Sequence, residues 1–346
     1  GPHAWLSTAL TDLTINDLRH YANDRPGSLR VVTREQLLML LSEARHIERL
    51  HALGMLSARQ AREMRRQVKV DDMVFGTYTV RGNEVTVRVQ VVTQASGRVR
   101  AQFRDAARRT DILDLQKRLA GRLLAFYDGG DAERITDDLP RWTDSLSATQ
   151  RLYRGIKLFD EGRFNRAWLE FRMAKRADPD YADALYWTGR LHYYRQEFDH
   201  ANVDFQRFID RYPEHPRVGD AVMELTHTHE RRTNDPQQIL RHYKELRQRN
   251  WGDVVVHNLI HETSTSPLSD WLSKRVQQVY RWTGQYQKAF DLMIDNIDDG
   301  QYQEGEDGLP DWKQESHRLI EMLARLSEDR NGVRVRHRLS GLRDIV

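Results

Sequence analysis

The sequence contains no cysteine among its 346 residues. A chain without thiols forms no disulfide bond, thiolate zinc site or iron–sulfur cluster, and it has no cysteine nucleophile. Apolar runs are also short, since none approaches the roughly 18 residues that a membrane-spanning helix requires, and no signal-peptide pattern opens the chain. These absences leave a globular protein, and 39% hydrophobic residues supply enough apolar side chains for a core.

Lysine is scarce as well, because the 54 basic residues comprise eight lysines and 46 arginines. Against 51 acidic residues they give a formal charge of only +3. We attribute the excess of arginine to genome composition and predict no nucleic-acid partner. Gly1-Pro2-His3 is typical of residues left by protease cleavage. Membrane anchoring is therefore expected only through a removed N-terminal segment, such as one that carries a lipid-modified cysteine.

Apolar spacing close to 3.6 residues predicts an amphipathic helix over 5–22, with Asp12, Asn16 and Arg19 on its solvent-facing side. A short strand is predicted at 29–32. Two further helices are expected to begin at the next capping residues, Thr33 and Ser57.

A β-rich segment follows, and its clearest strand alternates polar residues with valines at period 2: Val85, Val87, Val89 and Val91. Strands are also predicted at 73–80 and from Val99, with turns at Gly82 and Gly97. A leucine-rich helix over 113–124 can cover the apolar face of this sheet. Three regions are therefore predicted: an α/β domain with a small, mostly antiparallel sheet, a linker and an all-α domain, at 1–127, 128–147 and 148–346.

The second half repeats itself at a shift of 34 residues. Gly, aromatic, Ala, aromatic and Pro recur in the same order, as Gly155, Phe164, Ala167, Phe171, Pro179 and then Gly189, Phe198, Ala201, Phe205, Pro213. The small residues let paired helices approach closely, and the proline ends the second helix of each pair. Further pairs are predicted over 217–249 and 268–297, with a capping helix over 311–328.

This pattern resembles the tetratricopeptide repeat (TPR) family. The resemblance implies a right-handed superhelix whose concave face, lined by the first helix of each repeat, binds peptides or helices of other proteins. Transferred to this chain, it gives eight candidate partner-binding residues: Leu152, Ile156, Phe159, Asp183, Tyr186, Arg190, Tyr193 and Tyr194. The tyrosines and Arg190 are types that anchor interfaces, although packing against the next repeat is an alternative.

The first half is similar to the CsgG/TolB-N-like domains of bacterial envelope proteins. The similarity rests on the step from Leu29 to Glu35 and on 70–79, followed by Gly82-Asn83 and a valine-rich strand that closes at Ser96-Gly97. The chain departs from that family by beginning at a helix instead of a strand. The long hairpins of the pore-forming curli secretion member are missing too, so we expect no pore.

Three constellations suggest other chemistry, and for each we favour a simpler interpretation. His257 and His261 have the i, i+4 spacing of zinc proteases, but Asn258 replaces the catalytic glutamate. Residues 295–306 match a calcium loop only in part, which favours an acidic loop. The arginines of 334–343 fit a solvated tail. We predict no catalytic residue, no metal and no cofactor.

The sequence therefore predicts a non-enzymatic scaffold or assembly factor of the bacterial cell envelope, periplasmic or associated with the outer membrane. It would recruit a protein or peptide through the concave TPR face. The alternative is a cytoplasmic regulatory or sensor region of a larger signalling protein linked to a cyclase or kinase. A metal-dependent hydrolase that uses His257 and His261 is the third hypothesis.

Overall fold

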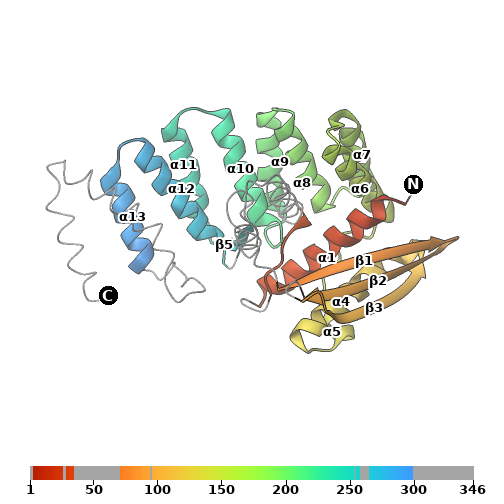
Figure 1. Ribbon diagram of the computed structural model, residues 1–346. Coiled ribbons are helices and arrows are strands. Elements are labelled where there is room, and N and C mark those ends of the chain that lie inside the picture. Colours follow the sequence, from red (N-terminus) through yellow and green to blue (C-terminus); the bar gives the residue numbers. More distant parts are fainter. Residues whose placement is uncertain are drawn as a thin grey trace, which may run out of the picture. The chain divides into compact units, whose positions relative to one another are not determined.

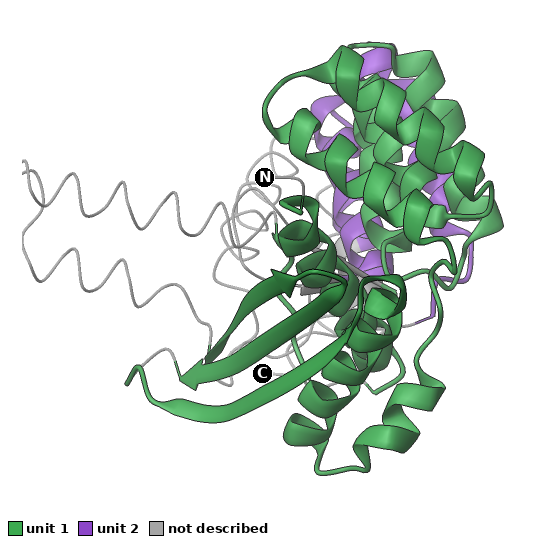
Figure 2. Cartoon of the chain, turned by 90° about the vertical axis from the view of Figure 1, so that its right-hand side faces the viewer, with its two compact units in different colours: residues 1–228, 253–265 green, residues 229–252, 266–346 purple. Residues whose placement is uncertain are grey.

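The computed structural model describes residues 3–25, 29–34, 71–93, 96–252, 254–257 and 265–298. In these residues a small antiparallel sheet precedes a long series of helices, as the sequence predicts (Figure 1). The chain divides into two compact units, coloured separately in Figure 2. The first contains residues 1–228 and 253–265, and the second contains 229–252 and 266–346. The units thus divide after Thr228, and the linker predicted at 128–147 lies inside the first unit.

The first unit begins with helix α1 (Trp5–Asn23). Three antiparallel strands follow in the order β1 (Asp72–Arg81), β2 (Glu84–Thr93) and β3 (Val99–Arg108). Gly82 and Gly97 turn the chain between them at φ values of 58° and 69°, in the left-handed region that glycine tolerates best. The predicted hairpins are confirmed.

One face of this sheet is buried. Val85, Val87 and Val91 of β2 are almost fully buried, and helix α4 (Ile112–Asp128) packs against the sheet through β3. A single turn of 3-10 helix (Arg109–Asp111) connects β3 to α4. The leucines of α4 at the buried positions 115, 119 and 123 provide the cover that the sequence predicts for this face of the sheet.

The predicted linker contains a short helix, α5 (Ala132–Asp138), whose N-terminus is capped by the Asp131 side chain. Ile135 of α5 lies in an apolar cluster with Tyr21, Ala120, Leu124 and Leu139. Leu29 packs beside the same cluster, but residues 29–33 form no regular secondary structure. The strand predicted at 29–32 is therefore wrong: the apolar signal there comes from a loop residue that packs beside this core.

Two antiparallel helix pairs follow, at the period that the sequence shows. They are α6 (Leu146–Asp160) with α7 (Phe164–Ala177), and α8 (Ala182–Tyr194) with α9 (Phe198–Arg211). In each pair a glycine of the first helix faces a buried phenylalanine of the second: Gly155 faces Phe171, and Gly189 faces Phe205. A β-carbon at either glycine would meet that ring, so the predicted close approach is confirmed.

The turn inside each pair has the same geometry. Gly162 and Gln196 follow the first helix with φ values of 69° and 62°. The next backbone N–H in each turn donates back to a helix carbonyl: Arg163 donates to Leu158, and Glu197 donates to His192, both at 2.8 Å. These are the left-handed ends that commonly terminate helices.

The remaining helices among the described residues are α10 (Val218–Arg232), α11 (Pro236–Arg247), α12 (Leu268–Trp282) and α13 (Tyr286–Asp298). They lie where further pairs are predicted. In the second unit, α11, α12 and α13 share a core that includes Tyr243, Val276 and Phe290. Two three-residue strands, β4 (Val255–His257) and β5 (Thr265–Pro267), separate α11 from α12 in the sequence.

Several predictions lie outside the described residues. They are the helices expected from Thr33 and Ser57, most of the calcium-like loop, the capping helix over 311–328 and the basic tail. His261 also lies outside, whereas His257 belongs to strand β4. The helical spacing assumed for this histidine pair is therefore wrong at His257.

Candidate functional site

Helix α1 is buried on its polar side as well as on its apolar side. Leu6 and Leu13 are 3% exposed, as expected for an amphipathic helix, but Asp12, Asn16 and Arg19 are at most 2% exposed. The solvent-facing side predicted for these three residues is wrong. Within the first unit, α1 packs against α4 and also against α6. Its polar side contacts residues of the helix pairs.

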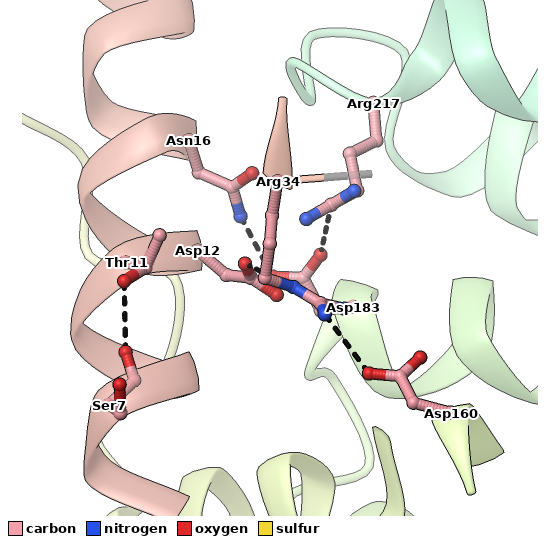
Figure 3. A network of polar contacts seen from close by, with 8 residues as sticks. All are labelled: Ser7, Thr11, Asp12, Asn16, Arg34, Asp160, Asp183 and Arg217. Carbon is pink, nitrogen blue, oxygen red and sulfur yellow. Dashed lines mark hydrogen bonds and ion pairs between the residues drawn. The ribbon is translucent and has the colours of Figure 1, made fainter. Parts of the chain in front are cut away.

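Asn16 and Asp183 form the central contact of this interface (Figure 3). The side-chain amide of Asn16 donates to Asp183 Oδ2 at 3.0 Å. The Oδ1 atom of the same carboxylate lies 2.9 Å from Arg217 Nε, and the Asp183 and Arg217 side chains are 1% and 4% exposed. Asp183 sits in the first turn of α8, and Arg217 immediately precedes α10. One buried carboxylate therefore joins α1 to both neighbouring repeats.

Arg34 connects the same region to the end of α6. Its Nε donates to Asp12 Oδ1 at 3.0 Å, and its Nη1 donates to Asp160 Oδ2 at 3.0 Å (Figure 3). Asp12 is buried, while the Asp160 side chain is 43% exposed. The Arg34 contact therefore runs from the buried interface to its solvent-exposed edge.

Arg19 makes the corresponding contact with α10. Its Nη1 donates to Asp220 Oδ2 at 2.9 Å, and the Arg19 and Asp220 side chains are 3% and 9% exposed. Asp220 lies in the first turn of α10, where a carboxylate also interacts favourably with the helix dipole. Buried ion pairs hold their geometry only when both partners remain, because one uncompensated charge is costly. The surface that α1 contacts consists of α6, α8, α10 and Arg34, which is itself bound to Asp160 at the end of α6. We name this surface the first-helix face.

A second group of polar residues lies at the same end of α1. Asp17 accepts hydrogen bonds from Gln116 at 2.8 Å and from the Trp142 indole at 2.7 Å. Burial raises the pKa of Asp17 to about 6, against these hydrogen bonds, which lower it. The Trp142 ring also meets the His215 ring edge-on, with centroids 4.8 Å apart. Burial lowers the pKa of His215 to about 4, and its Nδ1 accepts the Arg217 backbone N–H.

The predicted partner-binding residues fall into a buried set and an accessible set. Leu152 and Ile156 of α6 are fully buried, and Phe159 is 8% exposed. Tyr186 is 4% exposed and packs against Phe205 and Phe208 of α9. Its ring therefore takes part in packing between helices, the alternative that the sequence left open.

Arg190 is also buried. Its guanidinium lies 4.7 Å from the centre of the Trp187 ring, and its Nε lies 3.3 Å from Glu224 of α10. Tyr193 is half-buried against Phe198, whereas Tyr194 is 51% exposed and touches Phe159 edge-on. Of the eight predicted residues, Tyr194 offers the largest accessible surface.

The sequence pattern predicts no interface role for several residues that lie here, including Asp12, Asn16, Arg19, Arg34, Trp142, His215, Arg217 and Asp220. On a helix, positions 12, 16 and 19 fall on one stripe, and that spacing is the signal that was present. The same spacing is typical of a solvated face, so it does not distinguish a buried interface from a solvent-exposed side of the helix. The acidic partners lie 167 and 201 positions away along the chain.

Within the part of the chain that the structure describes, no group of three or more His, Asp or Glu residues could hold a metal ion. No helix among these residues is both long and apolar enough to cross a membrane. Comparisons with family models and with curated proteins find no match to this chain.

Proposed function

We propose that this chain is a non-enzymatic scaffold or assembly factor that recruits a protein partner through its helix pairs. The observation that carries the proposal is that the first-helix face already holds a helix, α1, through a hydrogen bond from Asn16 to Asp183 and an ion pair between Arg19 and Asp220. A surface with this chemistry is suited to binding helical segments.

The repeated packing supports a TPR-like superhelix for the helix pairs. The same close approach of a glycine to a phenylalanine occurs in the pairs α6–α7 and α8–α9, and the same left-handed turn joins the two helices of each pair. Repeats that stack in this way form extended surfaces on which other proteins bind. The superhelix and its partner-binding role are parts of the proposal.

For the N-terminal region we propose a CsgG/TolB-N-like domain and a place in the bacterial cell envelope, in the periplasm or at the outer membrane. The support is the short antiparallel sheet with tight turns, covered on one face by α4. Fold-level likeness of this kind supports a compartment only by analogy.

The alternative, a regulatory region of a larger signalling protein, draws support from the position of α1. This helix packs against α4 on one side and α6 on the other. A ligand that moved the sheet region would therefore change contacts on the helix pairs as well. Full-length protein from the source organism with a cyclase or kinase domain attached would favour this alternative over the scaffold.

Site-specific photo-crosslinking in cells tests the scaffold proposal. A photoreactive phenylalanine derivative at Tyr194 should capture one abundant partner, because 51% of this side chain is exposed beside Phe159 and Arg190. The matched control is Leu169, which is 53% exposed but lies on α7, a second helix of a pair. Capture of the same proteins from both positions would mean that Tyr194 marks no specific site.

Once the partner is purified, its affinity for the chain gives the quantitative test. Tyr194→Ala should weaken binding by about 2 kcal/mol, or roughly 30-fold, if Tyr194 is an interface anchor. Leu169→Ala should leave the affinity unchanged. Equal affinities for wild type and Tyr194→Ala would remove this residue from the proposed interface.

A further inference from the structure

We infer that the first-helix face selects a helix carrying a carboxylate, an amide and a guanidinium at positions i, i+4 and i+7, and that α1 is an internal occupant that competes with such a partner. The inference rests on the proposed function, because it names the chemistry of the partner and the way in which access to it is controlled.

The spacing follows from the three contacts of α1. Asp12 meets Arg34, Asn16 meets Asp183, and Arg19 meets Asp220. Positions 12, 16 and 19 lie on one stripe of a helix, so a single docked helix makes all three contacts together. Reversing any one charge would place like charges opposite each other in a buried site, which gives the face its selectivity.

The face contributes the complementary groups from separate helices. Asp183 begins α8, and Asp220 begins α10. Because these carboxylates lie in the first turns of two successive first helices, a docked helix must cross both to reach them. A partner helix that lacked the guanidinium would not reproduce the contact that Arg19 makes with Asp220. Its absence should weaken the complex and leave the stability of the free chain unchanged.

The polar character of this contact favours release. Buried ion pairs roughly break even against desolvation, so the polar part of this contact adds little net free energy that a competitor must overcome. A competitor that offers the same three groups replaces the polar contacts that α1 gives up on the face. The net free energy of exchanging α1 for a partner helix therefore depends mainly on the other contacts of α1 with the face, which the three groups do not reproduce.

A fluorescent peptide with the sequence of residues 4–24 tests the inference on the full chain by anisotropy. The wild-type chain should bind this peptide weakly because α1 occupies the face. Arg19→Asp in the chain weakens only the internal occupant, since the face is unchanged. Peptide affinity should therefore rise at least about tenfold.

Charge exchange supplies the matched controls. A chain with Asp220→Arg should reject the wild-type peptide and bind a peptide that carries Asp at the position of Arg19. The chain with both Arg19→Asp and Asp220→Arg restores its internal pair and should bind neither peptide well. Far-UV circular dichroism checks that each chain is folded. If Arg19→Asp unfolds, Arg19→Met keeps the aliphatic contacts, and the same gain in affinity is expected.

The inference is overturned if the wild-type peptide binds the Arg19→Asp and Arg19→Met chains no better than the wild-type chain. It is equally overturned if the exchanged peptide does not distinguish Asp220→Arg from wild type. If the peptide test fails but Tyr194 captures a specific protein, the scaffold proposal stands with a different kind of partner. If the peptide test succeeds but Tyr194 captures nothing, α1 is a ligand of the face and the proposed recruitment of a partner is wrong.

Discussion

Asn16 on α1 donates a hydrogen bond to Asp183 on α8, although 167 positions separate the two residues in the sequence. Both side chains are buried, and the same carboxylate is paired with Arg217. The α/β region and the helix pairs are therefore joined by polar chemistry as well as by packing. The free energy of this contact is open to direct measurement.

Asp183→Ala should lower the free energy of unfolding by about 3–5 kcal/mol. The substitution removes the acceptor of Asn16 and the carboxylate beside Arg217, whose side chain is 4% exposed. A buried charge that loses its partner is costly because water does not replace it. Urea denaturation followed by circular dichroism measures the change.

The control for this substitution is Asp180→Ala, three residues earlier. The Asp180 side chain is 73% exposed and pairs with Arg211, which is also exposed. Exposed ion pairs contribute little, so the expected loss is below about 1 kcal/mol. Equal losses for the two variants would show that burial of the Asp183 network adds nothing to stability.

The strands and repeats were predictable because their signals are local. Alternating valines with glycine turns define β2 within ten residues, and the 34-residue recurrence places α6 to α9 without any knowledge of distant contacts. Gly155 and Phe171 illustrate the repeat signal, because the Phe171 ring packs where a side chain at position 155 would lie.

The docking of α1 was not predictable for the opposite reason. Asp12, Asn16 and Arg19 have the composition of a solvated face, and only partners far along the chain make their burial favourable. Tyr186 shows the same limit within a helix. Its type suits an interface, but the rings of Phe205 and Phe208 enclose it.

Acidification should destabilise the first unit through His215. Burial lowers the folded-state pKa of this residue from 6.5 to about 4, so only the unfolded chain takes up its proton between these values. The contribution of neutral His215 is therefore present above pH 6.5 and is lost as pH falls towards 4, by up to about 1.4 kcal/mol per pH unit. Denaturation curves across this range measure the slope.

His215→Asn should flatten that slope, because asparagine does not titrate and still offers an acceptor to the Arg217 N–H.

Asp17 acts on the pH dependence of stability in the opposite direction. Its raised pKa, about 6, means that the folded chain binds a proton first and gains stability as pH falls from 6 to about 3.8. Asp17→Asn should consequently steepen the acid loss. Identical pH slopes for both variants and wild type would contradict the two assignments.

Gly155→Ala and Gly189→Ala should differ in sign or size although they are equivalent positions. A β-carbon at Gly155 would overlap the Phe171 ring, whereas one at Gly189 would lie 3.0 Å from Phe205 Cε1. Alanine gains about 1 kcal/mol over glycine in a helix. We expect Gly155→Ala to lose about 1–3 kcal/mol net, and Gly189→Ala to stay within about 1 kcal/mol of wild type. Thermal and urea denaturation of both variants decides the matter.

Gln196→Gly should stabilise the chain. Among the described residues other than glycine, Gln196 is the one with positive φ, at 62°, and it occupies the turn position that Gly162 holds in the preceding pair. The left-handed conformation costs a residue with a β-carbon about 1–2 kcal/mol, and glycine avoids that cost.

Part of the gain is lost because glycine makes the unfolded chain more flexible, so the expected net effect is about 0.5–1 kcal/mol. Arg195→Gly is the matched control, since the adjacent residue has φ of −82° and should gain nothing. Gly162→Ala provides the reverse change and should destabilise by about 1 kcal/mol or more. A destabilised Gln196→Gly chain would mean that contacts of the glutamine side chain outweigh its backbone strain.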